Sequence, residues 1–331
     1  MGNGAALVLG NGGTLLGLTS ATGATVNLGD VYLSSGGEII GEGNTPSGII
    51  VSSGWSEIVL SGGSATGTVV SSGGFEIVSA GGTTTASTLE TGGTEAIASA
   101  GSAYEQVGSS TISVSGSVLS AVLNSGSVLD TGTGNAIITG PATGAATING
   151  GGGGTTVTAA GGAISVGGGN GGTLDFAGGT GAATVGGAGF GATALIGGSG
   201  SGSSLLIGGT GDTLEVGTRA STGSTAFVAG EGNSTLQGGT GTQAQEYFTN
   251  PLGNTGTATI TMNAGASTVI GGSGASTVTG GSSNDVFGFV KGHAGGTETI
   301  YNFKSGDNLA FAGYGYTATN VPMETIVSGN D

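Results

Sequence analysis

Apolar and polar residues alternate over short phrases of this chain, and clusters of glycine separate the phrases. SEIVLSGG at 56–63 is followed by FEIVSAGG at 75–82, so one phrase nearly repeats itself. Alternation over about three to five residues is typical of a short β-strand, and Ser-Gly-Gly clusters suit corners in which φ is positive. We therefore expect short strands joined by tight corners, with Glu pointing outward and Ile inward in each phrase.

The repeat has a period of 19 residues and keeps its register over four units. The glutamates at this spacing are Glu38, Glu57, Glu76 and Glu95. Self-similarity at this period is typical of a solenoid, in which each repeat forms one coil and buries its apolar side only against its neighbours. No window has helical periodicity with capping residues. We predict an all-β protein, a right-handed parallel β-solenoid with 19–20 residues and two short strands per coil in the N-terminal part.

Beyond Glu105 the apolar residues return about every ten residues, as at Val157, Val166 and Phe176, so we expect the coil geometry to change there. Residues 144–192 are the richest in glycine. A flexible linker remains an alternative for this segment, although the recurring apolar pairs favour a continued solenoid.

Composition excludes several classes of protein. The 331 residues include 80 Gly, 19 Asp or Glu, three Lys or Arg and no Cys, and the net charge is −16. Nucleic-acid binding needs clustered cations, which this chain lacks, and anionic membranes are disfavoured for the same reason. Hydrophobic residues make up 36% of the chain, which argues against disorder, while no long apolar run predicts membrane insertion. The N-terminus lacks the basic region of a secretory signal peptide.

Apart from Asp and Glu, the chain contains few side chains that are able to act as catalytic bases, acids or metal ligands. The candidate cationic groups are Arg219, Lys291, Lys304 and His293. One histidine and no cysteine exclude His/Cys metal clusters, and no constellation of nucleophile, base and acid is apparent. We therefore predict that the protein is not an enzyme, and we keep a polysaccharide-active enzyme as the third alternative.

Residues 31–107, with their V-x-S-G-G-x-x-x-V-x-x-G-G phrases, resemble the AIDA-type repeats of bacterial autotransporter adhesin passengers. Those passengers are understood as β-solenoids. The resemblance implies a place at the bacterial cell surface and a role in adhesion.

The C-terminal third has a different pattern. LIGGSGSGSSLLIGGTGDTLEVG at 195–217 and the two nonapeptides at 271–279 and 280–288 resemble the repeats-in-toxin (RTX) pattern G-G-x-G-x-D-x-U-x. That pattern builds a β-roll whose turns bind Ca²⁺ through carboxylates and carbonyls. The resemblance implies Ca²⁺ as a cofactor, with a few weak sites. Its candidate ligands are Asp285, Asp212, Asn284, Gly272, Gly281 and Asp307.

The segment NDVFGFVKGHAGGTETIYNFKSGDNLAF at 284–311 resembles the end of RTX exoproteins, with Glu298 and Asn302 where Asp is usual. Such proteins leave the cell by type I secretion, which implies an extracellular location. Seven of the fifteen Phe and Tyr residues follow residue 286, so we expect an aromatic closing segment.

The glutamate series allows two interpretations. Stacked coils would place these side chains about 4.8 Å apart, where repulsion in water is on the order of 1 kcal/mol per pair. They are either a solvated outer face that keeps the rod soluble or a column of carboxylates that divalent cations bridge.

The N-terminal phrase begins as if already inside a coil, and its apolar residues form a candidate assembly surface: Leu7, Val8, Leu9, Leu15 and Leu16. A coil end without a polar cap exposes strand edges, so we expect head-to-tail stacking of subunits. The predicted segments are an uncapped coil (1–30), the 19-residue repeats (31–110), an irregular Gly-rich solenoid (111–192), an RTX-like solenoid (193–288) and a closing segment with a candidate secretion signal (289–331).

These observations predict a secreted structural solenoid that self-associates into an extracellular filament, surface layer or biofilm matrix in a calcium-dependent manner. The alternative is an adhesin that binds surface glycans or neighbouring cells. The expected partners are therefore further copies of the chain and cell-surface polysaccharide.

Overall fold

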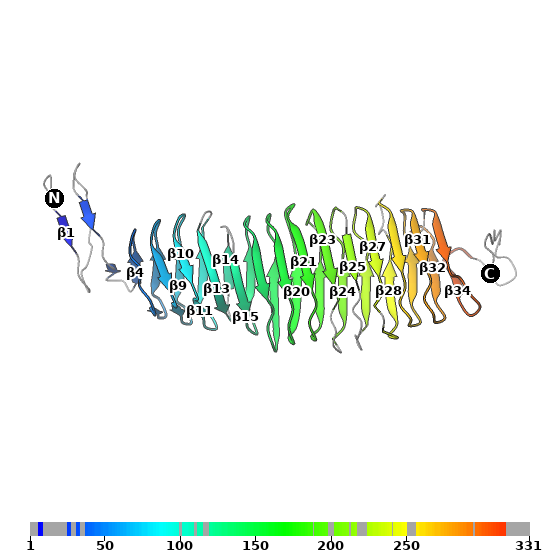
Figure 1. The fold of residues 1–331 in the computed structure, drawn as a ribbon, viewed down its shortest axis with the longest axis horizontal. Coiled ribbons are helices and arrows are strands. Elements are labelled where there is room, and N and C mark those ends of the chain that lie inside the picture. Colours follow the sequence, from blue (N-terminus) through cyan, green and yellow to red (C-terminus); the bar gives the residue numbers. More distant parts are fainter. Residues whose placement is uncertain are drawn as a thin grey trace.

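The protein is an elongated stack of β-strands in which two large parallel sheets face each other (Figure 1). The computed structural model describes residues 6–8, 25–27, 31–33, 37–98, 101–108, 111–114, 119–187, 189–197, 202–211, 213–216, 224–239, 241–249, 256–293 and 295–315. Each sheet has 16 strands. The predicted all-β parallel solenoid is confirmed, and its hand stays a prediction.

Sheet I contains one strand from each successive coil, all parallel except that β3 runs antiparallel to β4. Its strands are β3 (Val31–Leu33), β4 (Gly37–Ile40), β6 (Ser56–Val59), β9 (Phe75–Val78), β12 (Thr94–Ile97), β14 (Thr111–Val114), β16 (Val128–Thr131), β18 (Ala145–Asn149), β20 (Ala163–Gly167), β22 (Ala183–Gly186), β24 (Ser204–Ile207), β26 (Thr225–Val228), β28 (Gln245–Phe248), β30 (Thr268–Gly271), β32 (Val286–Val290) and β34 (Asn308–Ala312).

Sheet II forms the opposite wall of the stack. Its strands are β5 (Ile50–Val51), β7 (Ser64–Thr66), β8 (Val69–Val70), β10 (Thr83–Thr85), β11 (Thr88–Leu89), β13 (Ser102–Gly108), β15 (Leu119–Leu123), β17 (Ala136–Thr139), β19 (Thr155–Thr158), β21 (Thr173–Ala177), β23 (Ala192–Ile196), β25 (Thr213–Val216), β27 (Ser234–Gln237), β29 (Ala258–Thr261), β31 (Ser276–Thr279) and β33 (Glu298–Tyr301). A separate two-stranded parallel sheet pairs β1 (Ala6–Val8) with β2 (Thr25–Asn27).

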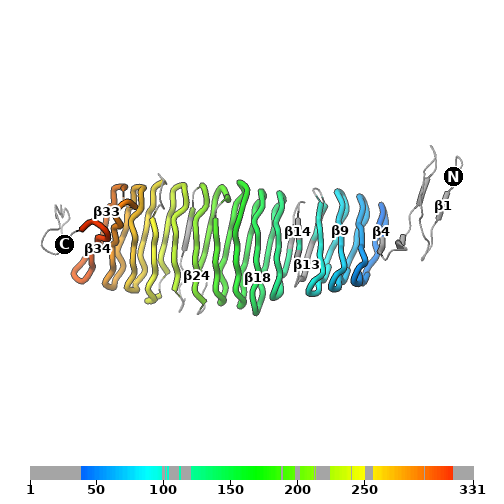
Figure 2. Tube along the Cα trace, turned by 180° about the vertical axis from the view of Figure 1, so that it is seen from behind, coloured from blue at the N-terminus to red at the C-terminus, as the bar shows by residue number. Residues whose placement is uncertain are grey.

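The first coils differ from the prediction of two strands per unit, because their sheet II side is divided into two short strands. In one coil β10 and β11 are separated by a bend in which Ala86 has a φ of 58°. Both halves pair with the single longer strand β13 of the next coil. From β13 onward each coil contributes one strand to each sheet, and Figure 2 shows these coils stacked along the rod.

The spacing of about ten residues is half a coil and not a shorter coil. The expected change of coil geometry near Glu105 takes place at β13, where the two short strands on the sheet II side become one. Val157 and Phe176 pair within sheet II, whereas Val166 and Val185 pair within sheet I. Consecutive apolar phrases therefore lie on opposite walls and meet in the core. Strands β18 to β23 continue both sheets through the Gly-rich segment, so the linker alternative is wrong.

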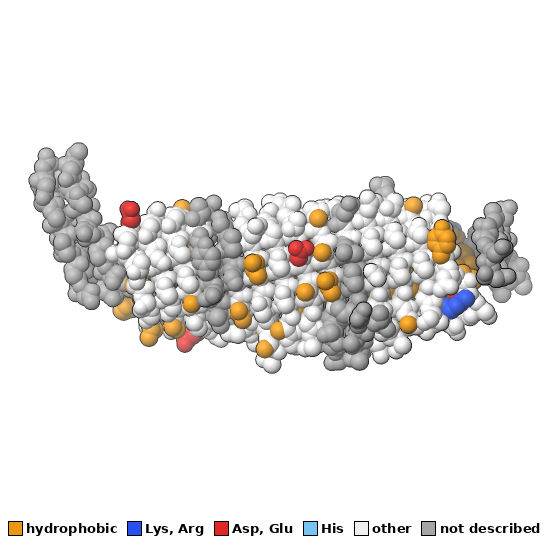
Figure 3. Space-filling view, viewed as in Figure 1, with side chains coloured by type: hydrophobic (Ala, Val, Ile, Leu, Met, Phe, Trp, Pro, Cys, Tyr) orange, Lys and Arg blue, Asp and Glu red, His pale blue; other side chains and the backbone are white. Residues whose placement is uncertain are grey.

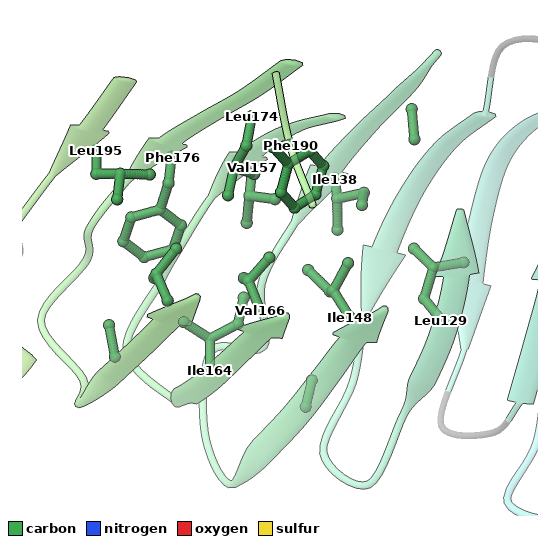
Figure 4. Close-up of a cluster of buried hydrophobic side chains, with 14 of the residues drawn as sticks. Leu129, Ile138, Ile148, Val157, Ile164, Val166, Leu174, Phe176, Phe190 and Leu195 are labelled. Atoms are coloured by element: carbon green, nitrogen blue, oxygen red, sulfur yellow. The ribbon is translucent and has the colours of Figure 1, made fainter. Parts of the chain in front are cut away.

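One continuous apolar core fills the space between the sheets. Figure 4 shows Ile148 and Val166 from sheet I facing Val157 and Phe176 from sheet II. All four are at most 2% exposed. Each such side chain contributes roughly 1.5–3 kcal/mol by burial, but only because a neighbouring coil covers it on either side.

Two kinds of glycine form the corners. Gly81 has a φ of 77°, as expected for a residue that reverses the chain. Gly82 has no such φ, but a Cβ there would lie 2.6 Å from the carbonyl oxygen of Val59 in the preceding coil. The second glycine of the pair is needed because adjacent coils approach closely.

No helix in the described residues is long and apolar enough to cross a membrane.

Gly82→Ala tests this close approach. We expect it to lower the free energy of unfolding by about 1–3 kcal/mol, because the methyl group would collide with a backbone carbonyl that cannot move away. The measurement is urea denaturation, with Gly167→Ala as the matched control. A Cβ at Gly167 has no neighbour within 4 Å and the φ there is ordinary, so the control should be neutral or stabilising by up to about 1 kcal/mol. Equal losses in the two variants would contradict the steric explanation.

Candidate cation site and buried acidic column

Three of the predicted calcium ligands come together where the last two coils meet. Gly281 and Asp285 form the corner that leads into β32, and Asp307 precedes β34 in the next coil. Asn284 is exposed and its amide lies against Gly306. Gly272 lies elsewhere, since its N–H donates to the Thr249 hydroxyl. Asp212 falls outside the described residues.

The Asp285 carboxylate holds the corner together. It is fully buried, and its two oxygens accept hydrogen bonds from the N–H of Ser267 at 3.0 Å and the N–H of Gly281 at 2.7 Å. Hydrogen bonds to a charged acceptor are stronger than neutral ones, and they compensate the carboxylate for the loss of water. Asp285 therefore serves as an acceptor for backbone groups of its own coil and of the preceding one.

This contact belongs to a column that repeats from coil to coil. The Gln245 N–H donates to the Ser267 hydroxyl at 3.2 Å, the Ser267 N–H donates to Asp285, and the Asp285 N–H donates to Asp307 at 2.9 Å. Each residue stands one coil after the previous one in the register of sheet I. The column links successive coils by side-chain-to-backbone hydrogen bonds in addition to the ladder of the sheet.

The same corner is built elsewhere with hydroxyl groups. The Gly281 N–H bonds to a side chain four residues later, and the N–H groups of Gly209 and Gly230 bond in the same way to the hydroxyls of Thr213 and Ser234. Sequence reasoning missed Thr213 and Ser234 because it searched the sixth position of each repeat for metal-binding carboxylates. The common requirement at that position is an acceptor for a backbone N–H.

The ammonium of Lys304 lies at the centre of the cluster. Its Nζ donates to the carbonyl oxygens of Gly281 at 2.7 Å and Ser283 at 2.6 Å, and to Asp307 at 3.3 Å. It also lies 3.9 Å from the Asp285 carboxylate. In the sequence Lys304 stands out only as one of a few cationic residues, and its spacing of three residues from Asp307 was the available signal for a contact.

The cluster as it stands does not fit Ca²⁺. Calcium needs about six to eight oxygen ligands at roughly 2.3–2.6 Å, and here the converging oxygens already bind an ammonium. Among the described residues no group of three or more His, Cys, Asp or Glu side chains is arranged to hold a metal ion.

The environment of Asp307 favours its charged form. Burial alone would raise the pKa of this carboxyl, but hydrogen bonds from the N–H groups of Asp285 and Lys304, together with the Lys304 ammonium, hold the pKa below its usual value. The contribution to stability is therefore present above the usual pKa of Asp and is lost as the pH falls through the lowered pKa.

The glutamate column lies inside the solenoid, and the expectation that Glu points outward and Ile inward is wrong. Glu57, Glu76 and Glu95 are all 0% exposed, whereas Ile77 is 37% exposed. Each strand places Glu and the residue two positions later, such as Val78, on the inner face. Glu38 pairs in register with Glu57, and its side chain is outside the description. The solvated outer face and a bridge between chains are both incompatible with these buried positions.

Two hydroxyl groups, one from β10 and one from the bend that follows it, donate hydrogen bonds to the buried Glu76 carboxyl. The Thr84 hydroxyl donates to Glu76 at 2.6 Å, and the Ser87 hydroxyl lies 3.3 Å from the same oxygen. Burial raises the pKa of Glu76, although these two hydrogen bonds act in the opposite direction. One coil later, Ala103 stands in the register of Thr84.

Glu95 has the least compensated environment. Neither of its carboxyl oxygens has a hydrogen-bond partner in the described part of the chain. Burial raises its pKa well above the ordinary value of 4.5, and the carboxyls of Glu76 and Glu57 raise it further. Such surroundings favour the neutral, protonated form of the carboxyl over the charged one.

The column becomes apolar directly after Glu95. The next residues in register are Ile112, Leu129 and Ile148, all fully buried. The same line of core positions is therefore acidic in the N-terminal coils and aliphatic thereafter.

Of the five apolar residues predicted to form the N-terminal assembly surface, the structure describes two. Leu7 and Val8 lie in β1, where they pair with Val26 and Asn27. Leu9, Leu15 and Leu16 lie outside the described residues. At the other end aromatic rings gather as expected: Phe289 stacks on Phe311 with centroids 5.3 Å apart, and Phe287 lies 5.7 Å from Phe303.

Comparison with known proteins adds little to this description. No protein-family model matches the chain, and no match is found among curated proteins. Among solved structures the chain resembles the crystal structure of the TibC-catalyzed hyper-glycosylated TibA55-350 fragment, with 23% identity and a TM-score of 0.48 over 84% of this chain and 92% of that one. A likeness at this level says nothing of function, and the solenoid fold rests on the strand pairing described above.

The buried column predicts that stability falls as the pH rises. A carboxyl with a raised folded-state pKa contributes fully below its unfolded pKa, near 4.5, and this contribution is lost as the pH rises through the folded pKa. We expect the free energy of unfolding to decrease as the pH rises above about 4.5, and Glu95→Gln to be more stable than the natural chain at alkaline pH.

Urea denaturation across this pH range measures the effect, and Glu90→Gln is the matched control because Glu90 is exposed. The control removes the same charge from the surface, so it should leave the pH slope unchanged. A slope that Glu95→Gln does not reduce would show that the column does not titrate in this range.

Proposed function

We propose that this chain is a secreted structural β-solenoid that self-associates end to end into an extracellular filament, surface layer or biofilm matrix. The observation that supports it best is the state of the last coil. Phe287 is 1% exposed, whereas Leu309, which follows it in the same column of sheet I, is 39% exposed. Within the described residues, Leu309 differs from Phe287 in having no later coil over it.

The last coil offers a second copy both apolar and hydrogen-bonding surface. Tyr301, Phe303 and Phe311 are 57%, 49% and 37% exposed. No strand follows β33 or β34 in the described part of the chain, so one edge of each sheet ends there. A parallel edge favours addition of another strand in the same direction. Stacking of a different coil on this edge is a heterologous contact, which gives an open polymer.

The flank of the rod is poor in charge. Only 7% of all residues are charged, and Figure 3 shows on one face mainly backbone and side chains that are neither charged nor hydrophobic, with scattered hydrophobic side chains. Such a flank offers little electrostatic steering toward a partner. Type I export and calcium dependence, which the RTX resemblance implies, are further parts of the proposal. The calcium would have to bind outside the corner 281–285, whose oxygens bind Lys304.

Adhesion is the second candidate, and two exposed aromatic side chains favour it. Trp55 and Phe75 are 45% and 47% exposed, and the Phe75 N–H donates to the Trp55 carbonyl oxygen across neighbouring coils. Aromatic faces at the surface are suitable for stacking against sugar rings. No catalytic role is part of either proposal.

The assembly proposal predicts that changes at either end prevent polymer formation. We expect the full chain to form fibres or sheets in negative-stain electron microscopy. Deletion of residues 1–30 and the variant Leu309→Asp should each leave separate rods, because the first removes the N-terminal surface and the second places a charge in the contact. The images are taken with about 5–10 mM calcium and again with a chelator, a range that saturates weak extracellular sites.

Ile137→Asp is the matched control, because Ile137 is 56% exposed on the flank. It should assemble as the natural chain does. Separate rods of the natural chain under both conditions would overturn the assembly proposal, and loss of assembly only in Ile137→Asp would indicate lateral contacts. If the natural chain forms fibres in calcium and not in chelator, this result would support calcium dependence.

The adhesin alternative predicts a direct optical signal. Trp55 is the sole tryptophan of the chain, so a polysaccharide that stacks on it should shift or quench the intrinsic fluorescence. Phe75→Ala should weaken the titration by roughly tenfold, if the ring contributes about 1.4 kcal/mol. Phe311→Ala removes a ring at the end of the stack and should have no effect. An unchanged emission with a panel of cell-surface polysaccharides would remove this alternative.

A further inference from the structure

Lys304 makes contacts that are unusual for a surface lysine. An ammonium has three N–H donors and no acceptor, and here three oxygens lie within hydrogen-bonding distance: Gly281 O, Ser283 O and Asp307 Oδ1. Two of them are backbone carbonyls, at 2.7 and 2.6 Å. The lysine thus donates hydrogen bonds to backbone carbonyl oxygens of one corner and also forms ion pairs.

The oxygens around Lys304 are of the kind that a divalent cation uses. They are two carbonyls of one glycine-rich corner and two carboxylates, Asp285 and Asp307, that stand in register on adjacent coils. Both carboxylate side chains are 0% exposed. The Lys304 ammonium lies within 4 Å of both carboxylates, 3.9 Å from Asp285 and 3.3 Å from Asp307, and so offsets their mutual repulsion.

The loop that carries Lys304 is shaped to place it there. Asn302, with a φ of 57°, donates its amide N–H to Gly280 O at 2.8 Å, beside the lysine contacts. The Asp307 carboxylate accepts the Lys304 N–H at 2.9 Å, and the Asp307 N–H donates to the Lys304 carbonyl at 3.1 Å. The loop therefore supplies both the Lys304 ammonium, which is the donor, and the Asp307 carboxylate, which is one of its acceptors.

We propose that the Lys304 ammonium is a tethered cation that takes the place of a divalent metal ion in the corner 281–285, so that the last coil closes without calcium. The oxygen cage remains a latent divalent-cation site that the lysine keeps closed. This inference concerns one corner and does not depend on whether the rods assemble.

Lys304→Met tests the proposal, because it removes the charge and keeps an unbranched side chain. The full-length variant is titrated with calcium chloride by isothermal titration calorimetry, and amide hydrogen exchange of residues 264–312 is followed with calcium and with chelator. We expect the natural chain to show no calcium-dependent protection in this region. Lys304→Met should lose protection at Ser267, Gly281 and Asp285 in chelator and regain it in calcium, with a Kd on the order of 0.1–1 mM.

Lys291→Met is the matched control, since Lys291 is an exposed lysine of the same segment. It should behave as the natural chain does. If Lys304→Met does not fold in chelator, refolding of this variant and of Lys304→Gln from urea with and without calcium decides: recovery only with calcium supports the proposal. Failure in both conditions, or no calcium binding by a folded Lys304→Met, overturns it. Calcium-dependent protection of the 281–307 region in the natural chain also overturns it, because calcium would then displace the lysine.

Discussion

The backbone hydrogen bonds between successive coils are the constraint on which the rest of this structure depends. Each strand pairs in parallel register with the equivalent strand before and after it, so that Glu57, for example, lies directly between Glu38 and Glu76. Equivalent side chains are therefore held about 4.8 Å apart along the axis, whatever their chemistry. The energetic effect of a side chain in this fold therefore depends on the residues at the same position in the coils before and after it, because these are its nearest neighbours.

Because of this register, residues at the same position in successive coils form a column, and the properties of the column depend on which residue types recur there. An apolar column stabilises itself, as between Val166 and Val185, since each member covers the next. A column of hydrogen-bonding side chains links coils, as Ser267, Asp285 and Asp307 do. A column of carboxyls is repulsive once ionised, and it is tolerated inside only when its members stay protonated.

The sequence was sufficient to predict the strands, the parallel stacking and the corner glycines, because these follow from the 19-residue register and from the conformational freedom of glycine. It was insufficient for the orientation of each strand. SEIV carries one aliphatic residue on each face, Ile58 and Val59, so alternation alone does not decide which face is buried. The hydroxyls of Thr84 and Ser87, which donate to the buried Glu76 carboxyl, come from β10 and the bend after it, on the opposite wall of the coil. Lys304 was also missed as a site residue, since its contacts lie 21 and 23 residues away in a neighbouring coil.

The rod solves the problem of buried carboxyls in opposite ways at its two described ends, and the two solutions respond oppositely to pH. The Glu95 carboxyl has a raised pKa and is compatible with the core while it is neutral, so rising pH acts against the N-terminal coils. The Asp307 carboxyl has a lowered pKa because the N–H groups of Asp285 and Lys304 donate to it and the Lys304 ammonium lies beside it, so falling pH acts against the C-terminal coil. In a solenoid each coil contacts only its neighbours, and local losses of this kind need not spread along the stack. Acid and base should therefore open the rod from different ends, because the weakest interface changes with the protonation state of the column that lies in it.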